Sequence, residues 1–335
     1  MEDIARECGV SKMTISRVLN GKKNGVSDSK RDEILAVADR MKYRTNRLAK
    51  SFFSNRSGFI GLALPFEGLL GSYYFARLVS GIQDALKDSE WELALFDTLS
   101  ESFDDGQKLA SLYLEKRVDG LIAIAPHYDD KFVESITEEE IPILVAGEPA
   151  LDDAVLTVNL DDEAGIEILF DHLRKKGHKD IGFISGPDNV LSAQTREAAY
   201  RMLMSRHRLL VKNEWIIKAA YSREEARNKS LKFLTRKELP TAMIAANDSM
   251  ALGFLDAAII RGIKVPDAIS IVGFDDLQES ASSYPKLTTV HQPIRRLGCE
   301  ATRTLINWIN NGQRPEPLPG IPAKLVIRQS VRDLS

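Results

Sequence analysis

The sequence predicts an α/β protein that carries a small, all-helical domain at its N-terminus. Three observations support this prediction. Residues 1–56 have apolar side chains at helical spacing and almost no strand pattern. From Phe59 onward, short apolar runs alternate with amphipathic helical segments, which is typical of parallel sheets covered by helices on both faces. The chain has 335 residues, enough for about two domains that each bury a core.

The N-terminal region contains three helical stripes that are small enough to close on one another. Gly9 lies between the first two stripes, where a tight turn needs it, and Ser11 stands at the N-cap position of a helix over Lys12–Asn20. Two helices joined by so short a turn form a helix-turn-helix unit. The apolar positions of the three stripes are Ile4, Ala5, Cys8 and Val10, then Ile15, Val18 and Leu19, then Ile34, Leu35, Val37, Ala38 and Met41.

The charge of the chain is divided unevenly. Residues 1–56 carry 13 Lys and Arg against 7 Asp and Glu, a balance of +6, whereas the rest of the chain carries 32 basic and 41 acidic residues, a balance of −9. We call residues 1–56 the head and the rest of the chain the body. A basic head joined to an acidic body indicates nucleic-acid binding, because phosphate contacts need clustered cations. Solvated helix faces rich in Lys and Arg are the alternative explanation.

The body is expected to contain two series of strands and helices, because it is too long for one sheet. We expect the stretch Val155–Asp161 to cross between the two lobes. The predicted strands are Phe59–Leu64, Glu92–Phe96, Leu121–Ala125, Ile143–Ala146, Ile181–Ser185, Ile216–Ala220, Ala242–Ala246 and Ser270–Phe274. The predicted helices include Phe75–Lys87, Gln107–Lys116, Glu163–Lys176, Arg196–Ser205, Glu224–Thr235 and Ser249–Arg261.

Composition and motif searches exclude several classes of protein. No apolar stretch is long enough to span a membrane, and the N-terminus lacks the apolar region of a secretory signal, so we expect a cytoplasmic protein. Cys8 and Cys299 are too far apart to suggest a disulfide or metal site, and we expect two reduced thiols. The phosphate-loop, dinucleotide, zinc-protease and hydrolase motifs are all missing. We therefore expect no metal, no cofactor and no enzymatic activity.

Several stretches closely resemble one family of bacterial transcription regulators, the LacI/GalR family. The resemblance begins with Asp3–Gly21, covers essentially the whole chain and keeps the family's order of motifs. The other stretches that carry it are Val26-Ser27, Tyr43, Asn46–Ser51, Arg117–Ile122, Gly177–Ile181, Ala246–Gly253, Val272–Asp276 and Leu287–Val290.

The resemblance implies that the second helix of the head reads DNA. Helical spacing places positions 12, 13, 16, 17 and 20 on one polar, cationic face, opposite the apolar positions of the same helix. By resemblance Lys12, Met13 and Arg17 occupy base-reading positions; Arg17 can bond a guanine bidentately, and Met13 can offer apolar contact only. Phosphate-positioning roles are implied for Thr14, Ser16 and Asn20, and a further DNA contact for Tyr43. A merely solvated helix face is the alternative.

The segment Asn46–Phe53 resembles the family's hinge helix. An isolated helix this short is unstable, so we expect it to order only against DNA and its symmetry mate. Asn46 and Ala49 are implied DNA contacts, and Phe52 takes the position of the residue that wedges into the minor groove, where Leu is usual. Thr45 replaces a common Pro. The first helix begins without an N-cap residue, so either its first turn frays or the true start lies upstream.

The body resembles the type I periplasmic-binding-protein fold, in which two α/β lobes hold a small ligand between them. The expected division is a helix-turn-helix domain over 1–45, a hinge helix and linker over 46–56, and a ligand-binding and dimerisation domain over 57–335. Within the last, lobe 1 is expected at about 57–158 and 291–318, and lobe 2 at about 159–290 and 319–335.

Five side chains are candidates for the ligand site. Asn247 and Asp275 directly follow apolar strands, and open α/β sheets bind ligands beyond the carboxyl ends of their strands. Arg196 matches the family's ligand-contacting Arg, and together these groups suit a polyol. Tyr74 and Phe75 are candidates to stack on an apolar ring face.

Each ligand candidate has a structural alternative. Asn247 is also placed to cap the following helix, Asp275 to form a turn, and Arg196 to be a lone surface cation. Tyr74 and Phe75 are equally suited to the lobe core. Gly147 stands where some sugar-binding members have an acidic residue, with Glu148 next to it, so the ligand's identity stays open.

The sequence as a whole predicts a ligand-responsive transcriptional regulator, usually a repressor, of carbohydrate-related genes. We expect a homodimer that binds double-stranded, pseudopalindromic operator DNA, with a sugar or sugar derivative as effector and a purine as the second choice. The chain end shows no leucine-heptad tail, so a tetramer built that way is not expected. The alternatives are a sugar-binding receptor without a DNA role and an enzyme acting on a small metabolite.

Overall fold

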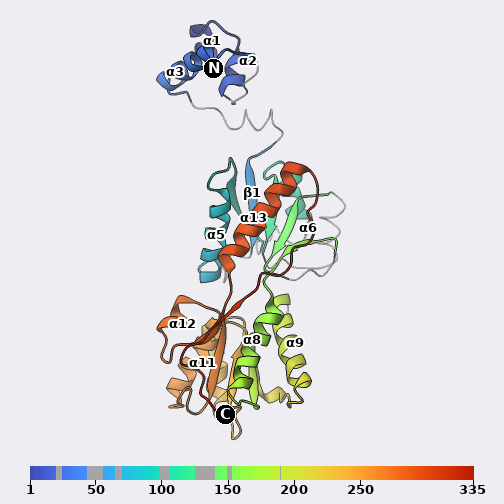
Figure 1. Cartoon of the computed structure of the whole chain (residues 1–335), viewed down its shortest axis with the longest axis vertical. Helices are drawn as coiled ribbons and strands as arrows, with labels where there is room; N and C mark the ends of the chain where they lie inside the picture. The colour runs from blue at the N-terminus through green and yellow to red at the C-terminus, as the bar shows by residue number, and fades with distance from the viewer. Residues whose placement is uncertain are drawn as a thin grey trace. The chain divides into compact units, whose positions relative to one another are not determined.

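The computed structural model describes residues 1–19, 25–43, 56–64, 70–98, 106–124, 140–148, 153–188 and 190–335. These residues form two compact units, Met1–Gly58 and Phe59–Ser335 (Figure 1). The first unit is all-helical among its described residues, and the second is α/β, as the sequence predicts.

The head consists of α1 (Glu2–Glu7), α2 (Lys12–Leu19) and α3 (Asp28–Arg40). Gly9 has a φ of +63°, which a tight turn requires, and the Ser11 hydroxyl accepts the Thr14 amide at 3.1 Å. The buried core of the head is formed by Ile4, Ala5, Cys8, Ile15, Val18, Ile34, Val37 and Ala38.

Two residues assigned to the head core from the sequence are exposed instead. Leu35 is 44% and Met41 40% exposed, so placing them in the apolar stripe was wrong. The core-facing side of α3 is carried by Ile34, Val37 and Ala38, and Leu35 lies about 100° around the helix from Ile34.

The first lobe of the body is built on a five-stranded, all-parallel sheet in the order β2-β1-β3-β4-β5. Its strands are β1 (Phe59–Leu64), β2 (Glu92–Asp97), β3 (Gly120–Ala123), β4 (Ile143–Ala146) and β5 (Leu156–Val158). Its described helices are α5 (Tyr73–Leu86), α6 (Gly106–Leu114) and α13 (Ile294–Asn311).

The predicted crossover at Val155–Asp161 is wrong in its first half. Leu156–Val158 is the edge strand β5, which pairs with β4, so the chain leaves the first lobe only after Val158. A three-residue strand is too short to stand out in a sequence pattern.

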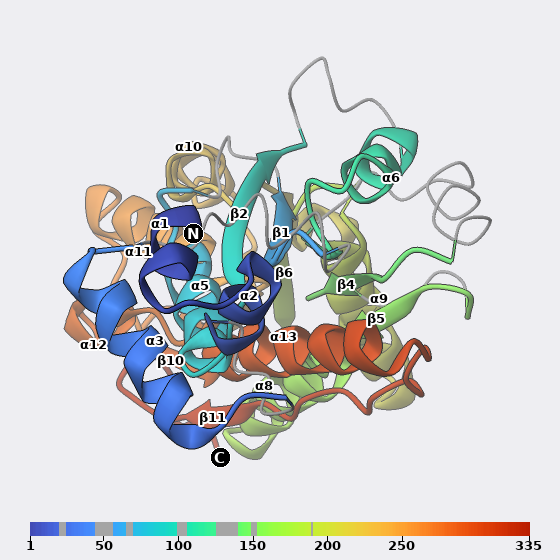
Figure 2. The ribbon, with the colours of Figure 1, turned by 90° about the horizontal axis from the view of Figure 1, so that it is seen from above.

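Helices α5 and α13 lie side by side although they are about 200 residues apart in sequence (Figures 1 and 2). Glycines make this close packing possible. A β-carbon on Gly81 of α5 would collide with the backbone oxygen of Arg295, and one on Gly298 of α13 would collide with the backbone oxygen of Leu78. The C-terminal part of the chain therefore completes the first lobe.

The second lobe is built on a six-stranded sheet in the order β11-β10-β9-β8-β6-β7. Its strands are β6 (Ile181–Ser185), β7 (Ile216–Lys218), β8 (Ala242–Ala245), β9 (Ser270–Asp275), β10 (Thr288–His291) and β11 (Lys324–Val326). Its helices are α8 (Asp162–Lys175), α9 (Leu191–Arg206), α10 (Arg223–Phe233), α11 (Asp248–Ile260) and α12 (Gln278–Ser282), with a short 3-10 helix, η1, at Asn213–Trp215. All pairs are parallel except β10 with β11.

The chain crosses between the lobes after β5, after β10 and after α13. Leu160 on the first crossing pairs with Ile321 on the third as an isolated parallel bridge. Such multiple crossings place the ends of strands from both lobes next to one another. None of the described helices is long and apolar enough to cross a lipid bilayer.

Candidate functional site

One face of α2 in the head is polar and exposed, and the opposite face is buried. Lys12, Met13 and Arg17 are exposed, with Met13 at 64%, whereas Ile15 and Val18 are buried in the head core. The helix faces are those that the spacing predicts.

Two candidate DNA contacts of the head already have partners within it. The Lys12 ammonium forms an ion pair with Glu2 of α1, which an incoming phosphate or base would have to replace. Tyr43 is half-buried and its side chain packs against the head core. Thr14 and Ser16 are half-buried on the flank of the exposed face. Asn20, Asn46, Ala49 and Phe52 lie outside the described residues, and so does the predicted hinge helix.

Arg196 is the centre of a polar cluster in the body. It extends from α9 and is only 7% exposed, so the alternative of a lone surface cation is wrong. Its Nε donates to Asp162 Oδ1 at 2.9 Å, and its Nη1 donates to the carbonyl of Ala246 at 2.6 Å. The guanidinium also lies 4.1 Å from the ring centroid of Phe274. Stacking and two hydrogen bonds fix its orientation.

Asp162 is a partner that the sequence did not single out. It is the first residue of α8 and follows Asp161, whose side chain caps that helix by accepting the Ala164 amide at 3.0 Å. Burial raises the pKa of the Asp162 carboxyl, and the Arg196 guanidinium opposes this rise. The two charges form a buried pair, in which either partner alone would be costly to bury.

Asp275 ends β9 with a strained backbone. Its φ is +126°, in the region that favours glycine, and the φ of the following Asp276 is +62°. The side chain of Gln292 donates to Asp275 Oδ1 at 3.1 Å. Burial raises the pKa of the Asp275 carboxyl well above its usual value, and Arg196 opposes this. Asp275 therefore forms a turn and also presents its carboxyl to the cluster around Arg196.

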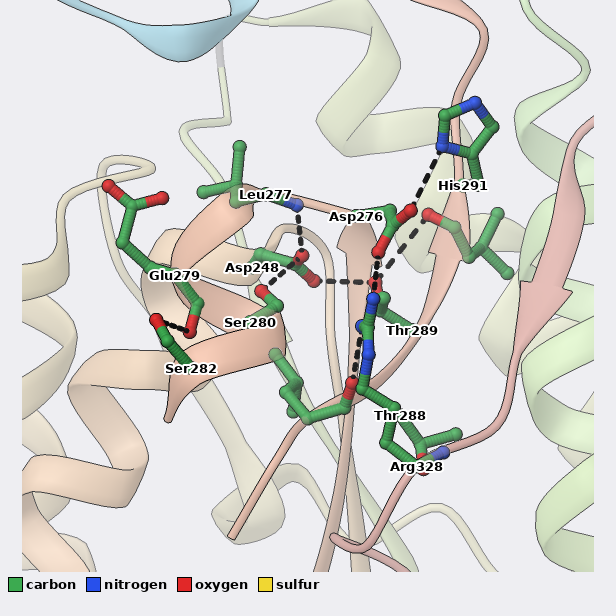
Figure 3. Close-up of polar contacts among 12 residues, drawn as sticks. Asp248, Asp276, Leu277, Glu279, Ser280, Ser282, Thr288, Thr289, His291 and Arg328 are labelled. Atoms are coloured by element: carbon green, nitrogen blue, oxygen red, sulfur yellow. Dashed lines mark hydrogen bonds and ion pairs between the residues drawn. The ribbon is translucent and has the colours of Figure 1, made fainter. Parts of the chain in front are cut away.

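The strained turn is held by the buried carboxylate of Asp248 (Figure 3). Asp248 accepts the backbone amide of Leu277 at 2.9 Å, and the hydroxyls of Ser280 and Thr289 at 2.6 Å each. These bonds tie the turn after β9 to α11, α12 and β10. Since strained conformations persist only where the surroundings determine them, Asp248 positions Asp275.

Asn247 caps the helix that follows it. Its Oδ1 accepts the amide of Met250 at 2.8 Å. The main contact of Asn247 is therefore a helix cap, which was the structural alternative for this residue. Its Nδ2 has one long hydrogen bond, 3.4 Å, to the carbonyl of Tyr221. Only this amide nitrogen is left to face a ligand.

Tyr74 and Phe75 both pack against the apolar core of the first lobe and are half-buried. Tyr74 nevertheless reaches the polar cluster: burial raises the pKa of its hydroxyl, and the nearby Glu148 carboxylate raises it further. Gly147 leaves room for that hydroxyl, because a β-carbon there would collide with it. Phe75 therefore belongs to the lobe core, which was the structural alternative for this residue, whereas Tyr74 lies between the core and the polar cluster.

Glu148 is the second residue that sequence reasoning missed, although its position beside Gly147 was noted. It follows β4 of the first lobe, is 8% exposed, and accepts the backbone amide of Ser192 at 2.8 Å and its hydroxyl at 3.2 Å. Ser192 lies on α9 of the second lobe, so this contact joins the lobes. Burial raises the pKa of Glu148 to about 7, partly opposed by the bonds from Ser192.

The cluster is thus assembled from both lobes, with Tyr74 and Glu148 from the first and Asp162, Arg196 and Asp275 from the second. A groove of about 530 Å³ touches the cluster only at Asp275; most of its lining comes from α5 and α13, so it is a separate surface and not the space around Arg196. Among the described residues, no group of His, Cys, Asp and Glu is arranged to hold a metal ion.

Comparison with known proteins gives matches over the whole chain. The family model for bacterial regulatory proteins of the lacI family matches residues 1–46, and that for a periplasmic binding protein-like domain matches residues 170–331. The HTH-type transcriptional repressor PurR of Haemophilus influenzae (strain PittEE) is 30% identical over 340 residues, covering 100% of this chain and 99% of the relative. Catabolite control protein A of Priestia megaterium is 29% identical, covering 98% of each chain.

A solved structure of the Lac repressor dimer bound to operator and the anti-inducer ONPF has the same fold. It superposes with a TM-score of 0.86 at 26% sequence identity, covering 98% of each chain.

Proposed function

Because this chain belongs to the LacI family of bacterial regulatory proteins, we propose that it is a transcriptional repressor whose operator binding is controlled by a small molecule held between its lobes. The observation that carries this proposal is the combination within one chain. A head that exposes Lys12, Met13 and Arg17 on one helix is followed by a body whose polar cluster comes from two lobes.

The head binds one half of a pseudopalindromic operator. Arg17 and Lys12 contact base edges in the major groove, Met13 makes apolar contact there, and Thr14, Ser16 and Asn20 bind phosphates. Tyr43 supports the head from its core and contacts the DNA backbone. Asn46, Ala49 and Phe52 make the minor-groove contacts, with Phe52 as the wedge. A homodimer matches the two-fold symmetry of such an operator, as in the similar Lac repressor dimer.

The division of the chain follows from these roles. Residues 1–45 form the DNA-binding domain, 46–56 the hinge helix and linker, and 57–335 the ligand-binding and dimerisation domain. Lobe 1 takes in about 57–158 and 291–318, and lobe 2 about 159–290 and 319–335. The packing of α13 against α5 and the pairing of β11 with β10 support this assignment of the C-terminal segments.

The effector binds at the cluster around Arg196. Asp275 and the Nδ2 of Asn247 hold polar groups of the ligand, Tyr74 contacts it from the first lobe, and Phe75 supports Tyr74. A sugar or sugar derivative is the proposed effector, because carboxylates, an amide and a guanidinium together match hydroxyl groups; a purine is the second candidate. The protein acts on DNA and therefore in the cytoplasm, and it performs no catalysis of its own.

Ligand binding changes the relation between the lobes and thereby the ordering of the hinge. A coupling of about 1–3 kcal/mol between the effector and operator sites is enough for regulation. The supporting observation is that Glu148 and Ser192 already connect the two lobes beside the ligand cluster.

Selection of random duplex DNA on the full-length protein tests the proposal. A pseudopalindrome should be enriched, and titration of the selected site with sugars and purines should reveal one compound that releases or tightens binding. Failure of a folded dimer to enrich any sequence would contradict the proposed function.

A further inference from the structure

An ion pair joins the first two helices of the head at the edge of the proposed DNA-reading face. Glu2 is the first residue of α1 and Lys12 the first residue of α2, and the Lys12 ammonium donates to the Glu2 carboxylate. Ile4 and Ile15, which follow within one turn on the same two helices, are buried in the head core. The packing of this core therefore holds the starts of α1 and α2 next to each other.

The stability of the fold does not account for this pair. The side chains of Glu2 and Lys12 are 67% and 60% exposed, and ion pairs this exposed contribute little to folding. The first turn of α1 also contains Asp3, which already places a negative charge near the positive end of the helix dipole. Arg17, the other cation of the DNA-reading face, forms no ion pair among the described residues. A carboxylate thus holds one of these two cations and not the other.

A carboxylate at this position affects contacts with phosphates and contacts with bases differently. On DNA of arbitrary sequence, a phosphate competes with Glu2 for the Lys12 ammonium and is repelled by the Glu2 charge. A guanine presents O6 and N7, which are uncharged acceptors and are not repelled in this way. Because an ammonium has three N–H donors, Lys12 can contact a guanine while it stays paired with Glu2. Glu2 therefore disfavours a phosphate contact of Lys12 more than a base contact.

We propose that Glu2 is a positioning residue for operator selectivity: it holds the Lys12 ammonium for base acceptors and away from phosphates, so that Lys12 contributes to sequence preference and little to general DNA affinity. An acidic side chain beside a DNA-reading helix acts here against binding to the wrong sequences. This inference rests on the proposed operator binding, and it adds a residue outside the proposed DNA contacts that controls one of them.

Binding of the full-length protein to two duplexes tests the proposal. One duplex carries the selected operator and the other a scrambled sequence, and both are titrated over a range of salt concentrations. Glu2→Gln and Glu2→Ala remove the carboxylate. Asp3→Asn is the control, because it removes an equal charge from the same turn, where Asp3 lies 4.0 Å from Arg6. Lys12→Gln, alone and combined with Glu2→Gln, completes a double-mutant cycle.

The two Glu2 variants should bind the scrambled duplex at least about threefold more tightly than the wild type, because Lys12 gains a phosphate contact and a like charge is lost. The slope of log affinity against log salt concentration should steepen by about 0.9, the value for one further phosphate contact. Affinity for the operator should change less, so the ratio of operator affinity to non-specific affinity should fall. Asp3→Asn should leave the slope unchanged, and so should Glu2→Gln in the Lys12→Gln background.

Folded Glu2 variants with the salt dependence of the wild type would overturn the proposal. Equal effects of Glu2→Gln and Asp3→Asn would also overturn it, and so would an effect of Glu2→Gln that persists without Lys12. Circular dichroism checks that each variant is folded. Binding to the scrambled duplex requires no operator, so these outcomes are separate from a failure to enrich any sequence, which contradicts the proposed function itself.

Discussion

Arg196 and Asp162 form a buried ion pair in which Nε and Oδ1 are 2.9 Å apart and both side chains are less than one-tenth exposed. The pair connects α9 to the start of α8 at the centre of the proposed ligand site. Because Arg196 is held by Asp162, by the Ala246 carbonyl and by the ring of Phe274, its direction is set before any ligand arrives. A site preorganised in this way loses little entropy on binding.

Replacing Asp162 by Asn should destabilise the body by about 3–5 kcal/mol, because the guanidinium of Arg196 would stay buried without a counter-charge. Chemical denaturation of the full-length protein measures this. The matched control is Glu167→Gln on the same helix, which breaks the exposed ion pair with Arg206 and should cost less than about 1 kcal/mol. Equal effects of the two substitutions would show that the buried pair contributes no more than the exposed one.

Replacing Arg17 by Ala should cost about 1–3 kcal/mol in operator affinity and relax the preference at one base position, without loss of the fold. Footprinting and competition with base-substituted operators measure both effects. Arg40→Ala removes an equal charge from α3, where Arg40 is paired with Glu7, and should leave the base preference unchanged. An Arg17 variant with unaltered preference at every base would remove this residue from the base-reading set.

Replacing Asp275 by Asn should weaken effector binding by about 1.5–3 kcal/mol, the usual worth of a hydrogen bond to a charged group, while operator binding without effector is retained. Calorimetric titration with the selected effector and a DNA-binding assay separate the two. Asp256→Asn serves as control, because it breaks the ion pair with Arg223 at a distant, more exposed position. Unchanged effector affinity in the Asp275 variant would place this carboxyl outside the site.

Glu148 should make the protein less stable as the pH rises. Burial raises its pKa from 4.5 to about 7 in the folded state, so the folded protein binds this proton more tightly than the unfolded chain. The contribution of Glu148 to the free energy of unfolding should therefore fall by about 3 kcal/mol between about pH 4.5 and 7. Above pH 7 this contribution should level off.

Glu148→Gln should remove this part of the pH dependence, so that the variant is more stable than the wild type at pH 8 and nearly equal to it at pH 4.5. Denaturation curves at both pH values measure the difference. Parallel pH profiles for the two proteins would mean that Glu148 titrates normally.

Replacing Gly81 by Ala should destabilise the first lobe by about 1–3 kcal/mol or more, because the new methyl group collides with the backbone of α13. Gly71→Ala is the matched control: a β-carbon there meets nothing within 4 Å. Thermal unfolding of both variants checks this, and a stable Gly81 variant would mean that α5 and α13 can separate without penalty.

Much of the fold could be predicted because local patterns carry it. Phe59–Leu64, Ile143–Ala146 and Ile181–Ser185 are strands with the predicted bounds, since buried parallel strands are continuous apolar runs. The strands β5, β10 and β11 were not predicted, because each has only three or four residues, too few to stand out as a pattern in the sequence. Helix α13 was not among the predicted helices, and its place in the first lobe depends on a long-range contact with Gly81.

The sequence by itself determined the helix-turn-helix head, the alternation of strands and helices, and Arg196 and Asp275 as candidate ligand residues, because each has a signal within a few neighbouring residues. Only the tertiary structure decided that Asp162 pairs with Arg196 and that Glu148 caps α9 from the opposite lobe. The partners in the two contacts across elements, Asp162 with Arg196 and Glu148 with Ser192, are 34 and 44 residues apart. Hydrogen bonds and charge pairing act over a few ångströms in space, and no periodicity along the chain encodes which distant side chains meet.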